Sequence, residues 1–179
     1  NAGPSSKKTI VVDTLAPVDI DLRSDISLTQ TTDTVYYNVQ AKQDGSKLIT
    51  SNVATPTDGD IGTLQIGVLS GVPTDYQLKL GGLQLLLTSG DARSGTTTFS
   101  TNLQLNWNIS ASRVITLSKT IGGAFTSTEL VSVEKALALV PSTSQNNVAN
   151  LGFNFTHIDL AGNNGNTSTV NLSFDTVAP

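Results

Sequence analysis

The sequence predicts an all-β protein, because its composition, its alternating polar and apolar residues and its turn residues all favour strands. Charged residues make up 13% and hydrophobic residues 37% of the 179 residues, and Thr, Ser, Asn and Gly occur at close intervals. This balance favours strands and turns over helices. The length fits one large domain or two closely packed sheets.

The alternation predicts the strands in order along the chain. The predicted strands cover residues 18–22, 34–41, 63–68, 76–80, 83–88, 96–107, 112–117, 148–158 and 169–174. Glycine and proline residues separate several of them, as expected for tight turns. Trp107 alternates with Leu105 and Ile109, which predicts a core position for the tryptophan.

One segment departs from the β pattern. Thr126 and Glu129 have the spacing of a capping box, and Leu130 and Val133 then follow at helical spacing. We therefore expect one short helix over residues 128–136, with an apolar side that fills the core.

The two ends of the chain repeat one another. Residues 10–17 read IVVDTLAP and residues 172–179 read LSFDTVAP, so Asp13 and Asp175 correspond at an offset of 175 minus 13, or 162 residues. The repeat predicts one unit displayed with the tail of its predecessor. The predicted parts are a strand of the preceding repeat or a loose arm (1–12), the unit itself (13–175) and the start of the next junction (176–179).

Composition argues against several kinds of site. The chain has no Cys, which excludes disulfides, thiolate metal sites and a cysteine nucleophile. A net charge of -4 without a basic cluster argues against nucleic-acid binding. No apolar run approaches the roughly 18 residues of a membrane span, and the start at Asn1 lacks a signal-peptide pattern, which predicts an internal fragment without membrane insertion.

No catalytic residue is predicted. His157 is the single histidine, and a lone histidine without Cys partners is more often structural than a ligand. No Gly-x-Ser-x-Gly pattern surrounds it, and no carboxylate pair falls in a recognisable frame. We expect that the protein is not an enzyme, and a hydrolase is the least favoured hypothesis.

The repeated ends carry a family resemblance. Asp159-Leu160-Ala161-Gly162-Asn163, followed by Asp175-Thr176-Val177-Ala178-Pro179, resembles the boundary signature of bacterial Ig-like tandem repeats in giant adhesins secreted by type I systems, the RTX adhesins. The resemblance implies an immunoglobulin-like β-sandwich, enlarged here by extra strands and one short helix. It also implies an extracellular location at the bacterial cell surface and a part in cell adhesion and biofilm formation.

The same topology predicts a calcium site. In an Ig-like sandwich the turn between the last two strands lies at the end where the first strand begins, which would bring Asp159 and Asn163 near Asp13. The loop with Asp44 should open at that end too. With backbone carbonyls, these residues would supply the roughly six to eight oxygens that calcium prefers. Asp175 would belong to the equivalent site of the following unit.

A metal-free alternative exists for the same turn. Asp and Asn side chains commonly cap the backbone of their own turn by hydrogen bonds. A second acidic segment, Asp58-Gly59-Asp60, lacks the rest of a calcium-binding loop and is predicted to be a solvated turn.

The leading functional hypothesis is mechanical. The unit would space and stiffen a fibre, with calcium at the junctions and with neighbouring repeats of the same chain as partners. The alternative is an adhesion module that binds a glycan or peptide, because the unit exceeds the roughly 100 residues of a seven-stranded sandwich. If exposed, Trp107, Tyr36, Tyr37 and Tyr76 could form a carbohydrate platform.

Overall fold

The computed structural model describes residues 32–37, 47–48, 59–69, 71–88, 90, 92–140 and 148–174. In this part of the chain two sheets and one short helix are present, which confirms the predicted all-β class. That the sandwich is immunoglobulin-like stays a prediction.

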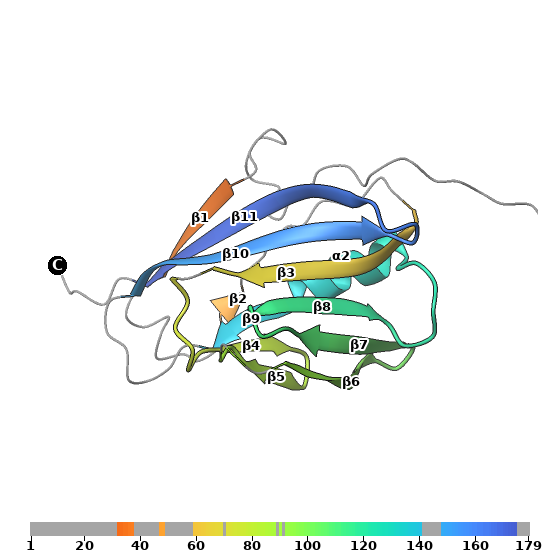
Figure 1. Ribbon diagram of the computed structural model, residues 1–179, viewed down its shortest axis with the longest axis horizontal. Coiled ribbons are helices and arrows are strands. Elements are labelled where there is room, and N and C mark those ends of the chain that lie inside the picture. The colour runs from red at the N-terminus through yellow and green to blue at the C-terminus, as the bar shows by residue number, and fades with distance from the viewer. Residues whose placement is uncertain are drawn as a thin grey trace, which may run out of the picture.

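The larger sheet has seven strands (Figure 1). In spatial order they are β1 (Thr32–Tyr37), β11 (Asn164–Phe174), β10 (Val148–Asp159), β3 (Ile61–Val68), β8 (Val114–Lys119), β7 (Leu103–Ile109) and β6 (Arg93–Ser100). The pairing is antiparallel except between β1 and β11, which run parallel. Because β11 begins at the β10–β11 turn and β1 runs parallel to it, both β1 and β11 lead away from this turn.

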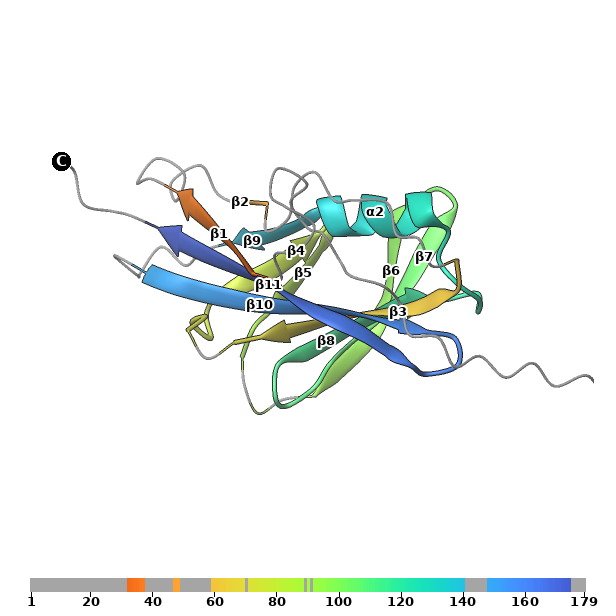
Figure 2. The same cartoon turned by 90° about the horizontal axis from the view of Figure 1, so that it is seen from above.

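The smaller sheet has four strands. In spatial order they are β2 (Lys47–Leu48), β9 (Leu137–Val140), β4 (Gln77–Leu80) and β5 (Leu83–Leu86). Figure 2 shows this sheet and helix α2 on the same side of the seven-stranded sheet. Buried side chains from both sheets and from the helix form one hydrophobic core, which includes Leu64, Leu78 and Val133.

Helix α2 (Ser127–Lys135) lies within one residue of its predicted bounds. Thr126 Oγ1 accepts a hydrogen bond from the Glu129 amide at 3.2 Å, and Glu129 Oε2 accepts one from the Thr126 amide at 2.8 Å. This capping box satisfies two backbone donors that a helix start leaves unpaired. Leu130 and Val133 are buried, as their spacing predicts.

One strand prediction was wrong, and strand β9 was missed. The segment predicted as one strand, 96–107, is divided between β6 and β7 by a turn at Thr101 and Asn102, because two polar residues reverse the chain there without glycine or proline. Strand β9 follows α2 directly and was not predicted, since its four residues lack polar alternation. The predicted strand 18–22 lies outside the described residues.

Trp107 packs beside the core and is half-buried, in agreement with its predicted inward position. Its register partner on β6 is Gly95, and a Cβ atom there would lie 2.9 Å from Trp107 Cζ2. A side chain at this position would therefore collide with the indole, which explains the glycine within a strand.

Candidate functional site

The turn between β10 and β11 holds the two predicted calcium ligands that the structure describes. Asp159 Oδ1 accepts a hydrogen bond from the Asn163 backbone amide at 2.8 Å, and Asp159 Oδ2 accepts one from Asn163 Nδ2 at 2.7 Å. Gly162 has φ +92°, a conformation that glycine adopts without steric cost. The predicted pair is thus together, but Asp159 acts as the cap of its own turn.

The electrostatics of Asp159 reflect this capping role. The side chain is buried, and burial by itself raises the pKa of a carboxyl group. Hydrogen bonds from the side chain and backbone of Asn163, and from the Ala161 and Gly162 amides, outweigh burial and hold the pKa below its ordinary value of 3.8. Asp159 is therefore a carboxylate at neutral pH.

Asp60 lies beside this turn. The Leu160 amide donates a hydrogen bond to the Asp60 carbonyl at 3.0 Å, which joins the start of β3 to the turn. The adjacent Gly62 leaves room for Leu160, because a Cβ atom there would lie 2.7 Å from Leu160 Cδ2. The sequence predicts only a solvated turn around Asp60, because its backbone contact depends on strand pairing that the sequence does not display.

The other predicted calcium ligands, Asp13, Asp44 and Asp175, lie outside the described residues. Within the described part of the chain, no group of three or more His, Cys, Asp and Glu side chains could hold a metal ion. Both Asp159 oxygens face N–H donors, so the Asn163 amide would have to turn over before its oxygen could join Asp159 on a cation. Calcium binding at this turn stays a prediction.

Strand β1 overlaps the second predicted strand, 34–41, but it runs opposite to the direction that would open the Asp44 loop at the pole of the turn. Thr32 aligns with Thr169, midway along β11, and Tyr37 aligns with Phe174 at its end, so β1 ends at the opposite pole (Figure 1). Asp13 precedes β1 in the chain. The proximity of Asp13 to Asp159 stays a prediction.

His157 forms a buried pair with Glu134. His157 Nε2 lies 2.5 Å from Glu134 Oε1, and the two side chains are 2% and 0% exposed. The pair joins the inner face of β10 to helix α2, so the single histidine holds the helix on the sheet. No hydrogen-bond partner for His157 Nδ1 occurs among the residues that the structure describes.

The predicted aromatic platform does not form as proposed. Tyr76 is fully buried, and burial together with the nearby Asp75 raises its pKa to about 12. Trp107 contacts the core on the inner face of the sheet. The side chains of Tyr36 and Tyr37 lie outside the described part.

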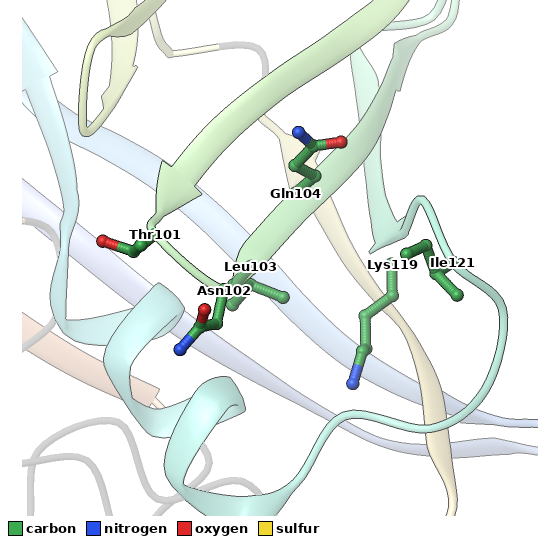
Figure 3. Close-up of a pocket in the computed structure, with 6 residues that line it drawn as sticks. All are labelled: Thr101, Asn102, Leu103, Gln104, Lys119 and Ile121. Carbon is green, nitrogen blue, oxygen red and sulfur yellow. The ribbon is translucent and has the colours of Figure 1, made fainter.

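The surface that the described residues form includes two hollows. One, of about 310 Å³, is lined by Thr101, Asn102, Leu103, Gln104, Lys119 and Ile121. Figure 3 shows the Lys119 and Ile121 side chains across from the β6–β7 turn. Lys119 is already engaged, because its Nζ lies 3.0 Å from Glu129 Oε2. The second hollow, of about 350 Å³, lies over β6, β7 and β8.

Comparisons with protein-family models, with curated proteins and with solved structures found no match. Among the described residues, no helix has the length and apolar character needed to cross a membrane. The family resemblance of the repeated ends therefore stays a prediction.

Proposed function

We propose that the chain is an extension unit of an extracellular bacterial adhesin, repeated in tandem along a fibre. The observation that carries this proposal is the return of Asp13-Thr14-Leu15-Ala16-Pro17 as Asp175-Thr176-Val177-Ala178-Pro179. Two copies of one junction, spaced a full unit apart, are what a tandem array requires.

The strand directions support a head-to-tail arrangement. Strand β11 leads directly into the second junction, and its Leu172 is buried in the core. The strand ends at the pole opposite the Asp159–Asn163 turn (Figure 1). In a tandem array, the end of one unit would then meet the turn pole of the next, and the junction prolines would restrict bending because proline fixes φ.

Calcium belongs to this proposal as a component of the junction. Asp13 and Asp44 would be its carboxylate ligands, and Asp159 would join them only after the Asn163 amide has turned. The chemical reason is charge: carboxylates brought together at a junction repel one another, and a hard cation removes that repulsion. Asp175 would serve the following unit.

A tandem protein tests the proposal. Two copies are joined so that Phe174 of the first is followed directly by Asp13 of the second, which reproduces the repeat offset. In small-angle X-ray scattering, we expect a rod with a maximum dimension of about twice that of one unit, because units in an array contact only their neighbours. Calcium should narrow the distribution of interunit bending.

A matched control replaces the proline at the junction, Pro17 of the second copy, with glycine. Its scattering should indicate a more flexible dimer, since glycine removes the backbone restriction. A compact tandem protein, or scattering that is identical with calcium and with a chelator, would contradict the extension role or the calcium component respectively.

A further inference from the structure

The outer face of the seven-stranded sheet carries no charged side chain over six of its strands, although the chain has 10 Lys and Arg and 14 Asp and Glu. On these strands the outward residues alternate with buried ones, and the pairing register aligns them. The outward residues are Ser94, Thr96, Thr98, Gln104, Asn106, Asn108, Val114, Thr116, Ser118, Thr63, Gln65, Gly67, Asn154, Thr156, Ile158, Thr167, Thr169 and Asn171. This surface, the neutral face, consists mostly of hydroxyl and amide groups.

The groups of the neutral face form continuous rows across the strands. One row runs through six aligned positions, in the order Ser94, Asn108, Thr116, Gln65, Thr156 and Thr167. Neighbouring strands lie about 4.8 Å apart, so the row is about 24 Å long. Every member can both donate and accept hydrogen bonds.

The side-chain hydrogen bonding differs between two parts of the neutral face, the part over β10 and β11 and the part over β6, β7 and β8. Over β10 and β11, the side chains bond one another: Thr156 Oγ1 lies 2.9 Å from Thr167 Oγ1, and Thr169 Oγ1 donates to Asn154 Oδ1 at 2.8 Å. In this half of the neutral face, side-chain donors and acceptors are therefore paired with one another.

Over β6, β7 and β8, the same kinds of groups do not bond one another. Ser94, Asn108 and Thr116 make no side-chain hydrogen bond with any other described residue. Asn106 has only a long contact, from Nδ2 to the Lys119 carbonyl at 3.4 Å. These donors and acceptors therefore face solvent and are free to meet a ligand.

The free groups surround the second hollow. Its volume of about 350 Å³ is at the lower end of the ~300–1,000 Å³ typical of small-molecule sites. Six neutral polar residues line it, namely Ser94, Thr96, Asn106, Asn108, Thr116 and Ser118, and Gly95 and Trp107, at inward positions of the strand alternation, complete the lining. The indole packed against Gly95 on the inner side supports this part of the lining.

We propose that this hollow binds a neutral saccharide. A sugar presents hydroxyl groups that donate and accept hydrogen bonds in every direction, and the lining offers the same capacity from both hydroxyls and amides. The lining has no cation for a carboxylate, sulfate or phosphate, and no anion for an amine. It also lacks the aromatic side chains of a typical protein-binding interface.

The same features set the expected strength of binding. No aromatic ring of the hollow faces outward to stack on a sugar ring, because the Trp107 indole contacts the core. One unit should therefore bind weakly, with a Kd of about 1 mM or above. Tandem units would multiply this affinity through avidity. The inference goes beyond an extension role and does not depend on it.

A titration followed by two-dimensional 15N NMR tests the proposal on the 179-residue chain. The probes are cellohexaose and maltohexaose as neutral saccharides and tri-galacturonate as an acidic one. We expect the side-chain amide signals of Asn106 and Asn108 to shift and to approach saturation with at least one neutral probe. The acidic probe should produce no such shift.

Variants locate the binding groups. Asn108→Asp keeps the shape of an exposed side chain but adds a charge, and Thr116→Val removes one hydroxyl at constant volume. Each should weaken binding about five- to tenfold, the loss of one hydrogen-bonding group. Gln84→Glu, the same amide-to-acid change at an exposed position of β5, should bind as the parent does.

Several results would contradict the saccharide proposal. The proposal fails if neither neutral hexasaccharide shifts these signals, if the shifts map to another surface, or if only tri-galacturonate binds. It also fails if Asn108→Asp binds like the parent. Thermal unfolding of each variant, expected to match the parent, shows that a loss of binding is not a loss of fold.

Discussion

Glu134 and Asp159 are both buried carboxylates, yet the fold holds them in different ways. Glu134 Oε1 is paired across the core with Nε2 of His157, which lies 23 residues away in the sequence. Asp159 is satisfied within four residues by the amides of its own turn. The comparison teaches that one carboxylate depends on tertiary structure, whereas the other depends only on a local loop.

The largest expected effect concerns the tertiary pair. Glu134→Ala leaves His157 buried without its carboxylate, so the free energy of unfolding should fall by about 3–5 kcal/mol. Urea denaturation measures the loss. The double variant Glu134→Leu, His157→Phe replaces the pair with apolar side chains and should recover most of it. A double variant as unstable as Glu134→Ala would show that the pair itself is not the cause.

A backbone change in the local turn should cost less. Gly162 has φ +92°, so Gly162→Ala should lower the free energy of unfolding by about 1–2 kcal/mol. Gly82→Ala is the control, because a Cβ atom there meets no atom within 4 Å and the residue is exposed. Equal effects at both positions would argue against the strain at residue 162.

The cap itself should have the smallest effect, and that effect should depend on pH. Asp159→Ala should lower Tm by about 2 °C at neutral pH, a small change for a domain of this size. Because the pKa of Asp159 is lowered on folding, its carboxylate stabilises the fold above pH 3.8, and this contribution is lost as pH falls through the lowered folded pKa. Thermal melts of parent and variant should therefore converge in acid, and a constant difference would contradict the cap.

The same distinction explains what the sequence could predict. The helix start at Thr126 and Glu129 and the turn at Asp159 and Asn163 are contained in short segments, so local chemistry predicts them. The Glu134–His157 pair was missed because its partners lie on different elements. The neutral face was missed as well, because it exists only once the strand register aligns residues such as Ser94 and Gln65.

In the proposed tandem array, each unit begins at the pole of the Asp159–Asn163 turn. Since the chain has no Cys, spin labels can be placed at Thr14→Cys and Ala161→Cys and their separation measured by pulsed electron resonance. Strand β11, with 11 residues, spans about 37 Å from the turn to the opposite pole, and Ser173→Cys paired with Ala161→Cys calibrates that separation. We predict a distance below about 25 Å between the labels at 14 and 161, and a distance as long as the calibrating pair would contradict the account.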